Sequence, residues 1–352
     1  MAFPLRLSML ACTTLAATAL GAEFDAALDA IAPDLRKWAV VCVVTTAADG
    51  APAFTWHEYK DSGSATDFWP ASTIKLYAAV AVLELLGERG FPLETTAIFE
   101  HQAAGESWTL DCARTVPEML HAVFSRSSNE DFTLLLRLVG IDRINTEFLT
   151  PARGFPHSAI MRGYVTERPF VYRTREAQRI TLRAGDGRTG TIEHTWSGRF
   201  YAEERGCTII DRRTGNVTSA RELAECLRRV LFHETLPEPE RYRLTPAQLE
   251  FLRHGANGLS GLETKERPSG PSAWRGGSDA AFPDARFFHK SGVISNYALD
   301  AAFVDDSAHG GARFILVPVI NAGSETKPID GETLVSQMSR VLAGWVRAAA
   351  IP

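Results

Sequence analysis

Residues 72–87 read Ser-Thr-Ile-Lys-Leu-Tyr-Ala-Ala-Val-Ala-Val-Leu-Glu-Leu-Leu-Gly, with Pro70 just before them. The stretch is apolar on nearly every side, and a helix of that kind is buried inside a protein. Proline before the first turn and glycine at the end, here Gly87, are typical helix boundaries. The stretch therefore predicts a buried helix. Ser72 and Lys75, three residues apart, would share one face of its first turn.

Strand patterns occupy the two ends of the chain. Residues 37–45 form a β-branched apolar run, and residues 53–59 follow across an Ala-Asp-Gly turn, so a β-hairpin is expected. Residues 287–304 and 313–320 also have strand patterns, and residues 331–349 have the pattern of a long amphipathic helix. The two ends are expected to share one α/β unit.

Helical patterns dominate the middle of the chain. They run through residues 116–139 and 141–149 and resume at 218–231 and 245–253. Residues 173–217 differ, because two short strand-like runs flank a Gly-Asp-Gly turn. We expect an exposed hairpin inserted in the helical region.

These patterns predict an α/β plus α fold, in which an antiparallel sheet is flanked by N- and C-terminal helices and a mainly helical domain is inserted. The expected α/β domain comprises residues 23–66 and 218–352. The expected helical domain comprises residues 67–217 and includes the hairpin region 173–217. A chain of 352 residues agrees with about two domains.

The first 22 residues have the pattern of a secretory signal, in which one arginine precedes an uncharged run that ends in small side chains. The run is too short for a confident membrane span. A lipid-attachment site at Cys12 is the less favoured interpretation, because the preceding residues match the lipidation pattern poorly. We expect a periplasmic or secreted protein without a membrane span after signal removal.

Four cysteines remain beyond the signal: Cys42, Cys112, Cys207 and Cys226. Four cysteines allow three complete pairings, and the sequence does not choose among them. Cys42 lies in an apolar run and is expected to be a buried thiol, so a Cys207–Cys226 bridge is the most plausible one. No histidine or cysteine spacing resembles a metal site, and we expect neither metal nor cofactor.

The charge balance is ordinary for a soluble protein, with 37 basic and 42 acidic side chains and a net charge of −5. Proteins dedicated to nucleic acids or anionic membranes carry a basic excess, so the composition argues against both classes of partner. The expected partner is a small-molecule substrate, and the expected state is a monomer.

The first motif is the pair Ser72 and Lys75. A helix start offers backbone N–H groups to a developing oxyanion. A lysine in an apolar helix loses solvation, which lowers its pKa and lets it accept a proton from the serine. The alternative is a helix-end hydroxyl beside a lysine that extends to water. Ser324 and Lys327 repeat the spacing, but there a proline follows and predicts a loop.

Two further motifs follow in order. Residues 127–129 read Ser-Ser-Asn before a helical pattern, where helix capping is the simple alternative. Residues 290–292 read Lys-Ser-Gly at the start of a strand pattern, where an ordinary edge strand is the alternative. The glycine would let a substrate backbone approach the strand closely.

Together the three motifs resemble the signature of the serine β-lactamase and penicillin-binding-protein superfamily. The chain is most similar to a class A β-lactamase over about residues 35–349, except for 173–217. Residues 134–145, a leucine-rich helical segment with Gly140 near its end, also resemble a family element. The resemblance implies a β-lactamase/transpeptidase-like fold, with the site where the two units meet.

The resemblance also implies roles for the first two motifs. Ser72 is expected to be the acylated nucleophile and Lys75 its activating base. Ser127 is expected to relay a proton to the departing nitrogen, and Asn129 to donate to an amide of the substrate. Water would then remove the acyl group from Ser72.

In the third motif, the resemblance implies that Lys290 holds Ser127 electrostatically and that Ser291 binds the substrate carboxylate. Gly292 would permit close approach. The oxyanion would be bound by the backbone N–H groups of Ser72 and Val293.

The chain departs from the class A pattern in three places. Ser128 stands where the family usually has Asp. Residues 159–170 lack the Glu-x-x-Leu-Asn sequence whose Glu positions the hydrolytic water, and Glu167 is the only carboxylate nearby. No arginine stands shortly after Lys290, where the class A pattern has one. Arg275 and Arg313 are the candidates for its role.

Three functions therefore remain open. The chain is predicted to hydrolyse β-lactams. Alternatively, it is a D-Ala-D-Ala peptidase or an esterase that releases β-lactams slowly, because the water-positioning Glu is missing. The third hypothesis is an inactive binding scaffold that uses residues 173–217 as its surface. The retained Ser72 and Lys75 argue against the scaffold.

Overall fold

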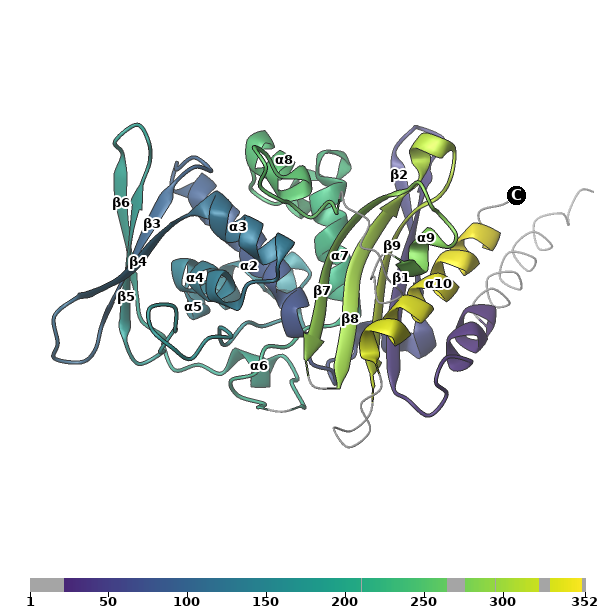
Figure 1. Ribbon diagram of the computed structural model, residues 1–352, viewed down its shortest axis with the longest axis horizontal. Coiled ribbons are helices and arrows are strands. Elements are labelled where there is room, and N and C mark those ends of the chain that lie inside the picture. The colour runs from purple at the N-terminus through teal and green to yellow at the C-terminus, as the bar shows by residue number, and fades with distance from the viewer. Residues whose placement is uncertain (1–21, 210, 265–275, 295, 323–329, 350–352) are drawn as a thin grey trace, which may run out of the picture.

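The computed structural model describes residues 22–209, 211–264, 276–294, 296–322 and 330–349 (Figure 1). The predictions for residues 1–21, for Arg275 and for the Ser324–Lys327 pair lie outside these residues.

A five-stranded antiparallel sheet joins the two ends of the chain. Its strand order is β2-β1-β9-β8-β7, and every neighbouring pair is antiparallel. The strands are β1 (Lys37–Thr46), β2 (Pro52–Glu58), β7 (Arg286–Ile294), β8 (Tyr297–Asp305) and β9 (Arg313–Asn321). The predicted hairpin at the start of the chain is confirmed, and so is the contribution of the C-terminal strands.

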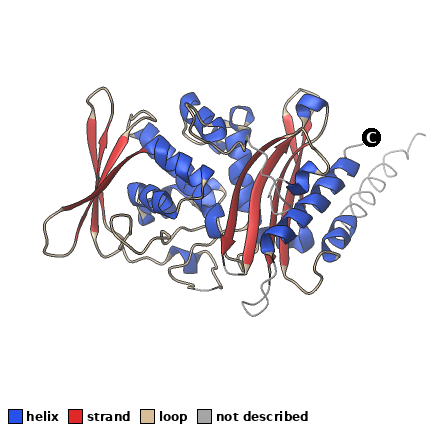
Figure 2. Cartoon of the chain, viewed as in Figure 1, coloured by secondary structure: helices blue, strands red, loops and turns tan. Residues whose placement is uncertain are grey.

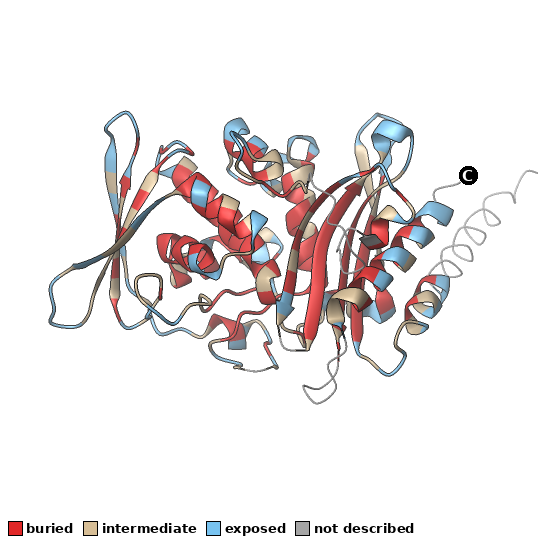
Figure 3. Cartoon of the chain, in the orientation of Figure 1, coloured by how far each residue is buried: buried red, intermediate tan, exposed pale blue. Residues whose placement is uncertain are grey.

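Helices cover both faces of this sheet. One face packs against α10 (Gly331–Ala349), α9 (Gly276–Asp279) and the helical residues 22–29. The other packs against α7 (Ala220–Leu231), which contacts β1, β8 and β9. The central strands are therefore buried on both sides (Figure 3), which explains why their sequences are continuous apolar runs.

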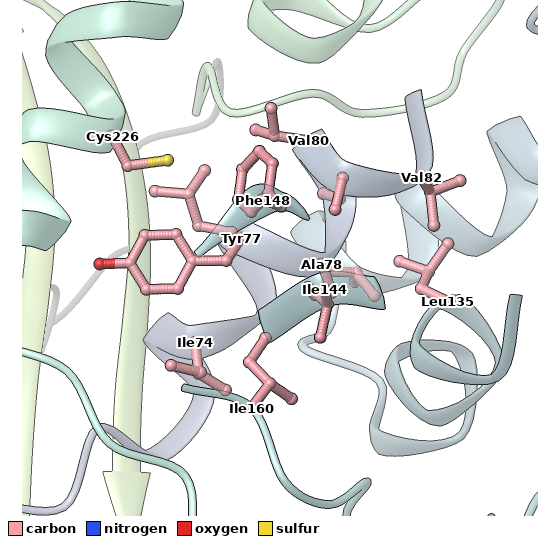
Figure 4. Packing of buried hydrophobic residues seen from close by; sticks show 14 of the residues in the cluster. Ile74, Tyr77, Ala78, Val80, Val82, Leu135, Ile144, Phe148, Ile160 and Cys226 are labelled. Carbon is pink, nitrogen blue, oxygen red and sulfur yellow. The ribbon is translucent and has the colours of Figure 1, made fainter. Parts of the chain in front are cut away.

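Further helices lie between this sheet and a second one (Figure 2). They are α2 (Lys75–Glu88), α3 (Val116–Ser125), α4 (Asn129–Val139), α5 (Ile141–Arg143), a π-helical turn (Ile144–Phe148), α6 (Tyr201–Glu204) and α8 (Pro246–His254). Helix α2 is buried from Lys75 through Leu86, as its sequence predicts. Its side chains pack against the π-helical turn and α4 (Figure 4). The predicted α/β plus α fold class is confirmed.

The hairpin predicted in residues 173–217 is not an isolated, exposed insertion. Its strands β5 (Ala177–Arg183) and β6 (Thr189–His194) extend a four-stranded sheet of order β4-β3-β5-β6. The other two strands are β3 (Thr96–Gln102) and β4 (Thr109–Thr115). Ile180, Leu182 and Ile192 are buried against the helices. The expectation of exposure was wrong because the pairing with β3 spans about eighty residues of sequence, beyond any local pattern.

The helical pattern over residues 116–139 is broken rather than continuous. Helix α3 ends at Ser125 and α4 begins at Asn129. Ser127 between them has a left-handed φ of 55°, which interrupts a right-handed helix. Ser128 caps α4, and its hydroxyl accepts a hydrogen bond from the Asp131 amide, so the capping interpretation holds for this residue.

The Cys207–Cys226 bridge, the pairing that the sequence favoured, does not form, because all four described cysteines are free thiols. Cys207 donates from Sγ to the carbonyl of Ile209. Cys226 extends from α7 into the same buried cluster as Tyr77 (Figure 4). Burial raises the pKa of the Cys226 thiol to about 12, which leaves it protonated.

Candidate active site

Side chains from all three motifs meet around Ser127. The Lys75 Nζ donates to the Ser127 carbonyl, to Asn129 Oδ1 at 2.7 Å and to Ser127 Oγ at 3.3 Å. From the strand β7, Lys290 Nζ donates to Ser127 Oγ at 2.9 Å and to the Ser291 carbonyl at 2.9 Å. The structure therefore places one serine hydroxyl between two lysine amines.

The break between α3 and α4 produces this arrangement. Only a short connection separates the two helices, and the left-handed backbone of Ser127 directs its carbonyl and hydroxyl to Lys75. Such a conformation is unfavourable for a residue with a Cβ. It is retained where the surrounding contacts hold it, which is typical of functional sites.

Ser72 lies at the start of the same helix, in a 3₁₀ turn (Ala71–Ile74) that leads into α2. It is half-buried. A Cβ at Gly292 would lie only 2.8 Å from the Ser72 backbone nitrogen. Glycine is therefore needed where β7 passes the turn, whereas the sequence predicted it for the approach of a substrate backbone. The backbone nitrogen of Ser72 and the strand that carries Val293 thus lie next to each other.

The Ser72 hydroxyl itself makes no hydrogen bond within the part of the chain that the structure describes. The Lys75 amine is instead directed to Ser127 and Asn129. Ser291 contributes its carbonyl to Lys290, and no partner of its hydroxyl is found among the described residues. Both hydroxyls are therefore available to a substrate.

Burial changes the acidity of both lysines. Loss of solvation, followed by the positive charge of Lys290, lowers the pKa of Lys75 to about 7. Loss of solvation lowers the pKa of Lys290 to about 8, against the opposing effect of the Asp300 carboxylate. Near neutral pH, Lys75 can therefore exist as a free amine while Lys290 is largely charged. That combination is the one an amine base beside an electrostatic anchor requires.

A cavity of about 350 Å³ opens at Ser72. Its lining residues are Trp69, Ala71, Ser72, Asn129, Arg162, Gly163, Tyr164, Thr166, Val293 and Ile294. None of these ten residues carries a carboxylate. Glu167 is exposed and is not among them. Glu167, the only carboxylate near the position of the missing Glu, is therefore not part of the cavity wall.

The cavity wall contains residues for which no role was predicted. The Tyr164 hydroxyl donates to the Ala71 carbonyl at 2.8 Å, and the Tyr164 ring centre lies 5.7 Å from Lys75 Nζ. Tyr164 therefore covers the lysine and fixes the turn that carries Ser72. The only signal in the sequence was the position of this residue in the segment that should contain the missing Glu.

Arg313 does not replace the missing arginine of the third motif. It pairs in register with Asp305 and lines a different cavity. Asp305 pairs with Arg286, at the end of β7 remote from Val293. Within the described ranges, no group of three or more His, Cys, Asp or Glu side chains could hold a metal ion. No described helix is both long enough and apolar enough to cross a membrane.

Solved structures with the same fold are β-lactamases and a penicillin-binding protein. A β-lactamase from Xanthomonas campestris aligns with a TM-score of 0.54 and 16% identity, over 93% of this chain and 98% of that one. A β-lactamase from Burkholderia phymatum aligns with a TM-score of 0.53 and 15% identity, over 94% and 100%. A PBP-A variant, solved as an acyl-enzyme with penicillin G, aligns with a TM-score of 0.53 and 16% identity, over 93% and 96%.

Among curated proteins, no sequence matches this chain. The family model described as the beta-lactamase enzyme family, in contrast, matches residues 54–346. That span contains the buried helix and all three motifs of the site. The chain therefore belongs to the beta-lactamase enzyme family and is a serine hydrolase.

Proposed function

We propose that this protein opens β-lactam rings through an acyl-enzyme on Ser72. The observation that carries the proposal is the meeting of Lys75 and Lys290 on the Ser127 hydroxyl, beside Ser72 and its cavity. A nucleophile, a base of lowered pKa and a proton-relaying hydroxyl are the parts that acyl transfer to a serine requires.

The acylation step follows from these contacts. A neutral Lys75 amine accepts the Ser72 proton while Ser72 Oγ attacks the lactam carbonyl carbon. The backbone N–H groups of Ser72 and Val293 bind the oxyanion that forms. The carbon–nitrogen bond then breaks, and Ser127 gives its proton to the departing nitrogen and regains one from Lys75. Lys290 stabilises the Ser127 oxygen in between, and Ser291 receives the substrate carboxylate.

A second candidate differs only in the fate of the acyl-enzyme. The ten lining residues of the cavity include no carboxylate that could activate water. Deacylation without a general base is slow, typically by a factor of about 10²–10⁴. A D-Ala-D-Ala peptidase or an esterase, which would hold β-lactams as long-lived adducts, is the activity that this observation favours. The inactive scaffold has no such support.

Intact-protein mass spectrometry separates these functions. The protein is incubated with a chromogenic cephalosporin and, separately, with a peptide ending in D-Ala-D-Ala. A short-lived adduct and a colour change with the cephalosporin indicate a β-lactamase. A lasting adduct with the cephalosporin and cleavage of the peptide indicate the peptidase. The adduct is expected to disappear in Ser72→Ala. It should persist in Ser324→Ala, which alters the second Ser-x-x-Lys copy. If no reagent labels Ser72, the enzyme proposal is wrong and the scaffold hypothesis stands.

We also propose that the protein is exported to the periplasm or secreted. The support is the pattern of residues 1–22. Expression of the full chain followed by N-terminal sequencing of the exported protein tests this. Cleavage near residue 22 is expected, and an uncleaved protein retained in the cytoplasm would contradict the proposal.

A further inference from the structure

Arg162 is the only charged residue among the ten that line the cavity at Ser72. The segment that carries it is firmly held. The buried Asn216 accepts hydrogen bonds from the amides of Met161 and Arg162, at 2.8 and 3.1 Å, and donates to the Arg162 carbonyl. The backbone of Arg162 is therefore fixed at the cavity edge.

The next residue restricts the segment further. A Cβ at Gly163 would lie 2.4 Å from the Thr133 hydroxyl oxygen, so the backbone packs directly on α4. Tyr164 then bonds to Ala71. A side chain on such a rigid support is held in place for binding before the ligand arrives.

Within the described ranges, the guanidinium of Arg162 forms no salt bridge with a carboxylate. Among the described residues it makes no hydrogen bond and no ion pair; it lies over the Trp69 ring, 5.6 Å from the ring centre. The Asp211 carboxylate interacts with it electrostatically. That carboxylate instead accepts hydrogen bonds from the Thr214 hydroxyl and from the amides of Arg213 and Thr214. Five N–H donors of a guanidinium remain available to a ligand.

The position of the cavity indicates which half of a substrate would meet Arg162. Asn129 lines the cavity, whereas Lys290 and Ser291 do not. The substrate carboxylate on the leaving-nitrogen side is expected at Ser291, so the cavity is left for the acyl side chain. Two cations lie on this side of the site: Arg162 in the lining, and Lys75, whose amine donates to Asn129 Oδ1.

We propose that Arg162 makes this enzyme selective for acyl donors whose acyl side chain carries a carboxylate. The guanidinium binds that carboxylate through charge-assisted hydrogen bonds, which are stronger than neutral ones. The inference rests on the proposed Ser72 acylation and adds to it the charge of the preferred side chain.

Two penicillins that differ by one group test the proposal. Benzylpenicillin and carboxybenzylpenicillin are identical except for a carboxylate on the side-chain carbon. The rate constant for Ser72 adduct formation is measured for each by intact-protein mass spectrometry, and their ratio is compared between variants. In Arg162→Gln the carboxybenzyl-to-benzyl ratio is expected to fall about tenfold, in line with a lost charge-assisted contact. Arg162→Lys should recover part of it.

Arg183→Gln provides the matched control, because it makes the same charge change at an exposed residue at the end of β5. Its ratio should equal that of the unaltered protein. Benzylpenicillin acylation reports folding in every variant. An unchanged ratio in Arg162→Gln would overturn the selectivity while leaving the acylation intact. If neither penicillin labels Ser72 in the unaltered protein, the proposed function falls, and the selectivity falls with it.

Discussion

The cavity at Ser72 has two unlike walls. The motif wall is formed by Ser72, Asn129 and the end of β7, with Lys75 and Ser127 behind it. It carries the three motifs, which direct hydrogen bonds join. The loop wall, residues 161–166, lacks the family's Glu-x-x-Leu-Asn sequence and presents an arginine and a tyrosine instead.

The difference separates two halves of one reaction. Acylation needs a nucleophile, a base and a proton relay, and the motif wall holds groups suited to all three. Deacylation needs an activated water, and the loop wall has no carboxylate for it. We infer that the chain retains the capacity to form the covalent intermediate, whereas the loop wall governs which acyl group enters and how long it stays.

The largest expected effect comes from removing the base in the motif wall. Lys75→Met keeps an unbranched side chain in the buried helix but has no amine. The acylation rate of Ser72 should fall about 10³-fold, because general base catalysis contributes that order of magnitude. Adduct formation followed by mass spectrometry measures it, and circular dichroism checks the fold. A rate within tenfold of the unaltered protein would assign the base to another residue.

The packing of the loop wall is tested next by adding a methyl group at Gly163. Gly163→Ala places a methyl against Thr133, and overpacking of this kind costs about 2 kcal/mol of unfolding free energy. Urea denaturation measures the change. The matched control is Gly185→Ala. A Cβ at this position would have nothing within 4 Å, so this variant should leave the unfolding free energy unchanged. Equal stability of the two variants would mean that the loop wall is not packed on α4.

The pH dependence of acylation reports the two lysines separately. Lys75 is active as the free amine, and its pKa is lowered to about 7. The acylation rate should therefore rise about tenfold per pH unit below pH 7 and level off above it. Lys290 is active as the charged form, and its pKa is lowered to about 8, so the rate should decline again above that pH. A rate that stays constant from pH 5.5 to 7 would show that Lys75 does not accept the proton.

The smallest effect is expected in the core that supports both walls. Cys226 packs there as a free thiol, so a reducing agent has no bond to break. The thermal unfolding midpoint should be the same with and without dithiothreitol. A midpoint that drops on reduction would reveal a disulfide and contradict the free thiols.

Much of this arrangement was accessible from the sequence. Local rules predicted the α2 helix and the terminal strands, because each depends on residues a few positions apart. The three motifs indicated the family through their order and their elements. The second sheet was missed, because β3 and β5 pair across a gap that leaves no local signal.

By itself, the sequence determined a buried helix and the Ser-x-x-Lys spacing at its start. Only the tertiary structure decided what those groups touch. Lys75 and Lys290 reach Ser127 from 52 and 163 residues away. Arg162 lines the cavity, and Asn216, 54 residues later, holds its backbone. Spacing along a helix is fixed by local geometry, whereas contacts across such separations exist only once the sheets and helices have packed.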